Sequence, residues 1–230
     1  MVFLESVVKI YKKVRLETPI LIEGLPGTGF VANICAISLV DALRAKKMGE
    51  IMSPYFTSLA TTETNGKIRT VRNELYYWKA PHGSHDLAIL YGNAQAINTY
   101  GQYELCSKII SYLQEIDCRF VITVGGIKKD RVFSPPRLYI TATDAETLNN
   151  LRKHGLNIIQ GHLYGATGLL LGLAKLRGLR GCCISVETQG TRPDILAAKE
   201  VLKLLENIVG IKINHNKIEK AAKKLEPLII

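Results

Sequence analysis

The sequence has no apolar run long enough to cross a membrane. The longest one, residues 169–174, is far short of the roughly 20 residues that a spanning helix needs. The first residues include Glu5 and no small-residue cleavage pattern, so we expect no leader peptide. The five cysteines are odd in number and none belongs to a CxxC pair, which argues against a secreted disulfide framework and a structural zinc site. We therefore expect a cytoplasmic protein with reduced thiols.

The sequence also has little that could make or break a covalent bond. Neither Ser53 nor Ser185 stands in a GxSxG elbow. His82, His85 and Asp86 have a spacing seen in metal sites. They occupy a turn with proline and glycine, however, and no fourth ligand is near, so a solvated hairpin tip is the simpler interpretation. We predict no catalytic residues, no metal and no cofactor.

Positive charge is in excess, with a formal net charge of +10 over 230 residues. Such a charge attracts phosphates. The basic residues are nevertheless scattered over separate turns and helix ends, without the interleaved aromatic residues that nucleic-acid stacking requires. We therefore do not expect nucleic acid or a membrane to be the partner.

The most informative stretch is residues 18–30, TPILIEGLPGTGF, where an apolar strand runs into a glycine-rich turn. The apolar spacing of residues 31–43 then predicts a largely buried helix. Glycines here let a backbone approach closely, and the first amides of a helix suit an anion. The spacing is not GxGxxG, and no Lys followed by Ser or Thr comes after Gly29, so the side chains of a Walker loop are absent. Tight helix packing and phosphate binding both remain open interpretations.

Buried strands alternate with helices along the rest of the chain. This pattern predicts a three-layer α/β/α sandwich with a mainly parallel sheet, to which hairpins, including one at Asn65 and Gly66, add antiparallel strands. Asp144 and Asp194 stand where helix N-caps are expected. Ligands of such sheets bind at the carboxyl ends of the strands. A candidate ligand cleft would therefore gather Gly24, Gly27, Gly29, Asn93, Gly125, Gly126 and Glu187.

Glycines recur within a leucine-rich helical segment, at residues 165, 168 and 172. Their spacing places them on one helix face. Because glycine inside a helix costs about 1 kcal/mol relative to alanine, we expect close packing of this face against the sheet to offset the cost.

We divide the chain into one main domain, residues 1–213, and a C-terminal basic helix with an apolar tail, residues 214–230. Lysines beside hydrophobic end residues and a free carboxylate are what a segment that docks into a partner's pocket needs. The alternative is that these residues fold back onto the protein's own core or fray. The candidate partner-binding residues are Lys220, Lys223, Lys224, Leu228, Ile229 and Ile230.

Three blocks in this order resemble the proteasome assembly chaperone family, type two, in its archaeal form. They are PILIEGLPGTGFVANICAISLVDAL, ELYYWKAPHGSHDLAILYGNAQ, and GHLYGATGLLLGLAKLRGLRGCCISVETQG leading into RPDILAAKEVLKLLENIVGIKI. The blocks lie within residues 18–213. The most specific pieces are the turn with Gly24 and Gly29, the glycine pattern of residues 161–172, and Pro193 with Asp194 at the start of a helix.

The resemblance implies a fold similar to that of nucleoside phosphorylases without their catalytic groups, small homo-oligomers, and binding to proteasome α subunits or α-rings. In the family, a tail of a hydrophobic residue, tyrosine and any residue contacts the ring. Here Leu228 is hydrophobic but Ile229 holds the tyrosine position, so one hydrogen bond, worth about 1 kcal/mol, is missing. We predict a non-enzymatic assembly chaperone or ring adaptor. The alternative is a nucleoside- or nucleotide-binding protein, or an enzyme, that uses the glycine-turn cleft.

Overall fold

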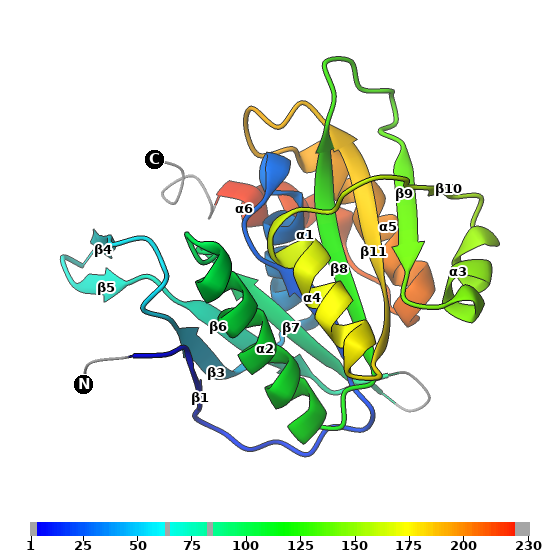
Figure 1. The fold of residues 1–230 in the computed structure, drawn as a ribbon. Coiled ribbons are helices and arrows are strands. Elements are labelled where there is room, and N and C mark those ends of the chain that lie inside the picture. The colour runs from blue at the N-terminus through cyan, green and yellow to red at the C-terminus, as the bar shows by residue number, and fades with distance from the viewer. Residues whose placement is uncertain (1–3, 63–64, 82–84, 224–230) are drawn as a thin grey trace.

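The computed structural model describes residues 4–62, 65–81 and 85–223. Within them, strands from the whole length of the chain form a nine-stranded sheet in the order β1-β3-β6-β7-β2-β8-β11-β9-β10, with helices on both faces (Figure 1). This arrangement confirms the predicted α/β sandwich. The strands are β1 Val7–Ile10, β2 Ile20–Gly24, β3 Lys46–Met52, β6 Asn73–Trp78, β7 Leu87–Gly92, β8 Phe120–Lys128, β9 Leu138–Ala142, β10 Asn157–Ile158 and β11 Arg180–Thr188.

The centre of the sheet is parallel. β2 pairs in parallel with β7 and β8, and β8 pairs in parallel with β11. These strands are covered on both faces, which explains why all of β2, and all of β11 after Arg180, is buried. Antiparallel strands extend the sheet on both sides, with β1, β3 and β6 beyond β7 and with β9 beyond β11.

Two helical layers enclose the sheet. α1 (Val31–Leu43), α5 (Ile195–Val209) and α6 (Ile218–Lys223) pack together on one face, and α2 (Thr99–Glu115) and α4 (Gly165–Leu176) pack together on the other. In Figure 1, α2 and α4 lie in front of the sheet. α3 (Ala145–Arg152) lies beside β9. Each face has its own cluster of buried apolar side chains, so the sheet separates two cores.

The predicted helix N-caps are confirmed. Asp144 Oδ1 accepts a hydrogen bond from the Thr147 amide at 2.8 Å, and Asp194 Oδ1 accepts one from the Ala197 amide at 2.9 Å. Each carboxylate satisfies an amide that has no partner inside its helix. The starts of α3 and α5 are therefore determined by local chemistry.

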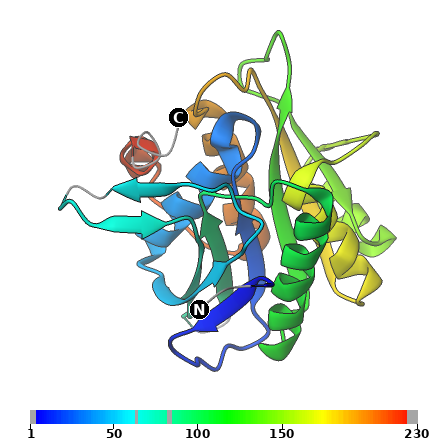
Figure 2. The same ribbon diagram turned by 60° about the vertical axis from the view of Figure 1, so that its left-hand side comes forward.

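The predicted hairpin at Asn65 and Gly66 is also confirmed. Strands β4 (Ala60–Thr62) and β5 (Ile68–Thr70) pair antiparallel around it and form a ribbon separate from the main sheet. Figure 2 shows this ribbon extending away from the sandwich. Gly66 has a φ of +79°, a backbone conformation that glycine adopts readily in such turns.

The C-terminal helix begins later than predicted. A 3₁₀ turn, η2 (His215–Lys217), precedes α6 (Ile218–Lys223), and residues 224 and 225 of the predicted helix lie outside the described residues. Ile218 and Ala222 are buried in the same apolar cluster as α1 and α5, so this part of the C-terminal segment shares the core of the sandwich. The division of the chain at residue 214 stays a prediction. Among the described helices, none is long and apolar enough to span a bilayer.

Candidate interaction surfaces

The glycine-rich turn after β2 is packed tightly against its neighbours. A methyl group at Gly24 would overlap Ala36 Cβ of α1, and one at Gly126 would overlap the carbonyl oxygen of Thr28. At Gly29, with a φ of +67°, it would lie 2.6 Å from Thr188 Oγ1. The turn after β2 therefore packs against the carboxyl-terminal halves of β8 and β11, and these glycines are needed for the close approach. Contrary to the prediction of a turn there, Gly125 and Gly126 lie inside β8, where both pair with β11.

The seven residues of the candidate cleft have different environments. Glu187 is only 3% exposed and accepts a hydrogen bond from the Tyr139 hydroxyl at 2.8 Å. Asn93 Oδ1 accepts a long one from the Arg72 amide, at 3.4 Å. Gly27 is the exception among the three turn glycines, because no atom lies within 4 Å of where its Cβ would be. The three cavities described below are lined by other residues, and ligand binding at the turn stays a prediction.

Buried polar side chains that sequence reasoning missed connect these turns. Glu23, fully buried on β2, accepts hydrogen bonds from the amides of Leu25 at 2.8 Å and Val124 at 3.4 Å. Asn33 Nδ2 donates to the carbonyls of Gly24 at 3.1 Å and Gly92 at 2.6 Å, across the junction of β2 and β7. The signal in the sequence is a carboxylate inside the apolar run ILIEG, where burial requires hydrogen-bond partners.

The carboxyl group of Glu23 has an unusually high pKa. Burial raises the pKa of its carboxyl group to about 7, and hydrogen bonds from Leu25, Val124 and Thr167 only partly offset this rise. The group is inaccessible to solvent, so it cannot exchange a proton with a substrate in this conformation. Its expected effect is on stability.

A second pair of carboxylates, Glu50 and Glu74, is brought together by the pairing of β3 with β6. Arg72 Nη1 lies 2.8 Å from Glu50 Oε2, and Lys47 Nζ lies 2.6 Å from Glu74 Oε1. Burial favours a higher pKa for Glu50, but hydrogen bonds from Tyr11 and Arg72 outweigh it and lower the pKa to about 2. The pKa of Glu74 is also lowered. Both side chains are therefore ionised near neutral pH, and neither is suited to act as a general acid there.

Only part of the turn that holds His82, His85 and Asp86 lies within the described residues. Asp86 Oδ2 accepts a hydrogen bond from the Glu17 amide at 2.8 Å, and its Oδ1 accepts one from the Ala80 amide at 2.9 Å. His82 lies outside the described residues. Among those that are described, no group of three or more His, Cys, Asp or Glu side chains could hold a metal ion.

The glycine face of α4 does not pack against the sheet, contrary to the prediction. Ala166, Leu170 and Ala174 are the α4 residues buried in the core on that side of the sheet. Gly165 and Gly172 are exposed instead, and nothing lies within 4 Å of a Cβ placed at Gly172. Both faces of this helix are apolar, and the face with larger side chains takes the core because it buries more apolar area.

A groove of about 560 Å³ runs along this glycine face, between α4 and the start of α2. We call its surroundings the α2/α4 face. None of the thirteen residues that line the groove is charged. The exposed apolar and aromatic residues around it are Ile97, Tyr100, Tyr103, Tyr164 (81% exposed) and Leu176 (82% exposed). An uncharged groove with exposed aromatic and apolar side chains near it is typical of a protein–protein contact.

A second groove, of about 920 Å³, lies where β11 ends, between the loop that follows β8, the start of α5 and the end of α6. We call it the β8/β11 groove. Phe133 and Leu196, half exposed at 50% and 49%, are among the apolar residues that line it. Arg192, Lys199, Glu219 and Lys223 are its charged residues besides the helix cap of α5. Lys199 and Glu219 pair at 3.5 Å.

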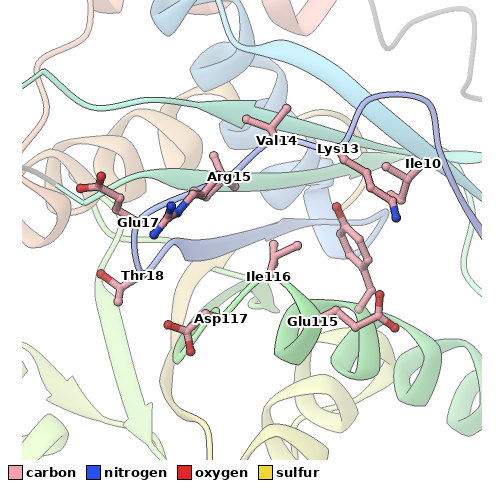
Figure 3. Close-up of a pocket in the computed structure, with 11 residues that line it drawn as sticks. Ile10, Lys13, Val14, Arg15, Glu17, Thr18, Glu115, Ile116 and Asp117 are labelled. Atoms are coloured by element: carbon pink, nitrogen blue, oxygen red, sulfur yellow. The ribbon is translucent and has the colours of Figure 1, made fainter.

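A third cavity, of about 620 Å³, lies where the chain enters β2, beside the end of α2. Figure 3 shows Ile116 at its centre, Lys13 and Glu115 on one side, and Arg15 and Asp117 on the other. Charges of both signs line it, so the cavity favours no single class of ligand.

The comparisons with known proteins agree with this geometry. The sequence matches the PAC2 family over residues 21–229. An uncharacterised protein of Methanocaldococcus jannaschii, MJ1210, is 33% identical over 216 residues, which are 93% of this chain and 83% of that protein.

Two crystal structures from Pyrococcus furiosus are similar in fold. PbaB, described as an archaeal proteasome activator, is 33% identical with a TM-score of 0.89, covering 98% of this chain and 97% of its own. PbaA, described as an archaeal homologue of proteasome-assembly chaperone, is 23% identical with a TM-score of 0.79, covering 96% and 93%; at that identity it shows the fold alone. The resemblance found in the sequence is therefore confirmed.

Proposed function

Because this chain belongs to the PAC2 family, we propose that it is a proteasome assembly chaperone or activator that acts by binding other polypeptides and not by catalysis. The observation that carries this proposal is the 33% identity to PbaB over nearly the whole of both chains. The proposed partners are proteasome α subunits or α-rings in the cytoplasm, and further copies of the chain itself.

The side-chain chemistry supports a binding role. Glu23 is sealed in the core, and the Glu50 and Glu74 carboxylates are held ionised by basic neighbours. The groove of the α2/α4 face has no charged residue in its lining, and the β8/β11 groove exposes Phe133 and Leu196 beside its charged residues. This combination is typical of a protein that presents surfaces to partners.

The C-terminal tail is the proposed ring ligand. Lys220 and Lys223 are exposed on α6. Lys224, Leu228, Ile229 and Ile230 follow them and lie outside the described residues. Apolar side chains that fill a pocket, next to cations at its rim, are the usual anchors of such contacts.

Deleting residues 228–230 is expected to weaken binding to archaeal proteasome α-rings by at least about tenfold, or about 1.4 kcal/mol, because the apolar anchors are removed. Ile229→Tyr is expected to strengthen binding several-fold, because the hydroxyl adds a hydrogen bond worth about 1 kcal/mol. Surface plasmon resonance with the intact chain and assembled α-rings measures both.

Ile68→Ala is the matched control, since Ile68 is an exposed apolar residue on β5, and it should leave ring binding unchanged. A truncated chain that binds as tightly as the full chain would remove the tail from the proposal. Failure of the full chain to retain α subunits would overturn the proposed function itself.

The α2/α4 face is the proposed contact between copies of the chain. One groove has both an exposed ring, Tyr164, and open space at Gly172, so two copies related by a two-fold axis could each place a ring in the other's groove. Two copies, each with a net charge of +10, repel each other in general. An uncharged face is where they can meet at the least electrostatic cost.

Gly172→Arg is expected to shift the protein toward monomer, raising the dissociation constant about tenfold or more, because a long cation would enter the groove. The fold should remain intact, since replacing an exposed helical glycine gains up to about 1 kcal/mol. Gly172→Ala is the control and should keep most of the assembly. Sedimentation velocity and native mass spectrometry measure the species, and an unchanged oligomer in Gly172→Arg would exclude this face.

A further inference from the structure

The β8/β11 groove offers apolar surface that no described residue covers. Its walls come from three separate segments: residues 132–136, residues 188–196, and the last turn of α6 with Ala222 and Lys223. Phe133 and Leu196 remain half exposed there. Arg137 stacks on Phe133, with Cζ at 3.3 Å from the ring centre, so the aromatic ring is supported in place.

Lys223, the last described residue of α6, lines this groove. Residues 224–230, KLEPLII, follow it in the sequence. A segment of this length reaches at most roughly 25 Å when extended, and it starts from a residue that already lines the groove. Pro227 prevents the helix from simply continuing. Leu225, Leu228, Ile229 and Ile230 supply apolar side chains.

Charge also favours this segment as the occupant. The groove has three basic residues, Arg192, Lys199 and Lys223. Of its two acidic residues, Glu219 pairs with Lys199 at 3.5 Å, and Asp194 accepts the Thr188 hydroxyl at 2.7 Å besides capping α5. Cationic charge is therefore in excess, and Glu226 lies between the apolar residues of the tail.

We propose that the β8/β11 groove is an intramolecular docking site for the chain's own C-terminal residues 225–230. If these residues are also the ring ligand, which rests on the proposed function, groove and ring compete for them. The apparent affinity for the ring is then reduced by the fraction of molecules whose tail is free. The groove thus acts as an autoinhibitory latch.

Disulfide trapping in the full chain tests the docking without any proteasome. The native cysteines, Cys35, Cys106, Cys118, Cys182 and Cys183, are all buried, so mild oxidation reports on introduced pairs. Leu196→Cys combined with Ile229→Cys should form an intramolecular disulfide at least about tenfold faster than the control pair, because docking raises the local thiol concentration. The control combines Leu176→Cys, at the exposed end of α4 on the other face of the sheet, with Ile229→Cys.

Mass spectrometry of the non-reduced protein shows whether the disulfide has formed within one chain or between two chains. Equal rates for the two pairs would overturn the proposal. A covalent dimer in place of the internal disulfide would also overturn it, since the tail would then occupy a neighbour's groove.

The regulatory consequence is tested by Leu196→Asp, which places a charge in the groove. This variant should bind α-rings at least about threefold more tightly than the unmodified chain, because its tail is released. Ile68→Asp, on the β4–β5 ribbon, is the control and should bind unchanged. Unaltered ring affinity in Leu196→Asp would overturn the latch. Absence of ring binding by every variant would overturn the proposed function. The disulfide-trapping experiment would still test whether the tail docks in the groove, because it needs no proteasome.

Discussion

Gly24→Ala is expected to destabilise the fold by about 3 kcal/mol, the upper end of the usual cost of overpacking a core. The new methyl group would overlap Ala36 Cβ and lie 2.9 Å from the Ala32 carbonyl oxygen. Both atoms belong to α1, whose first three turns are buried, so relief requires the helix to move. For a chain of this size the melting temperature should fall by roughly 6–12 °C. Thermal and urea unfolding measure the change.

Gly27→Ala is the matched control in the same turn. Gly27 has an extended backbone, with φ −159° and ψ −170°, and no atom lies within 4 Å of its added Cβ. Its effect on stability should be within about 0.5 kcal/mol. Equal losses in the two variants would contradict the packing interpretation of the turn.

The same pair of variants separates packing from ligand binding. If the turn holds a phosphate or nucleotide, ligand at 100 times its dissociation constant adds about 2.7 kcal/mol of stability to the unmodified chain. Gly27→Ala should then lose that gain while the unliganded protein stays stable. No shift with phosphate or any nucleotide in a panel would leave packing as the role of these glycines.

Glu23→Gln is expected to raise the free energy of unfolding at pH 8 by about 3 kcal/mol. Glu23 has a pKa of about 7 in the folded protein, above its usual value of 4.5. The folded state therefore holds this proton more tightly than the unfolded state does. The wild-type protein pays no ionisation penalty below pH 4.5 and loses stability as the pH rises to about 7. Glutamine stays neutral, so the variant should lack this loss.

Urea unfolding at several pH values from 4 to 8 measures the difference between Glu23→Gln and wild type. Glu50→Gln is a control of opposite sign, because the pKa of Glu50 is lowered to about 2. In the wild-type protein, the stabilising effect of the ionised Glu50 carboxylate is present above pH 4.5 and is lost as the pH falls through 2. If the difference in free energy of unfolding between Glu23→Gln and wild type does not change with pH, burial has not shifted the pKa of Glu23.

Sequence patterns predicted the turns, helix caps and hairpin whose positions are set by residues close to them in the chain. The glycine turn after β2, the caps Asp144 and Asp194, and the hairpin at Asn65 and Gly66 depend on residues a few positions apart. β3, which reads KKMGEIM, was missed because it opens with two lysines and contains Gly49. It becomes a strand through its pairing with β1 and β6.

The sequence by itself determined the alternation of strands and helices, the absence of a known phosphate-loop motif, and the family to which the chain belongs. Only the tertiary structure decided which face of α4 enters the core, why the pKa of Glu23 is raised, and that Lys223 of α6 lines the β8/β11 groove. These properties arise from residues far apart in the chain, such as Glu23 with Val124, or Phe133 with Leu196 and Lys223. Burial and charge environment depend on such contacts, whereas turns and caps depend on neighbours in sequence.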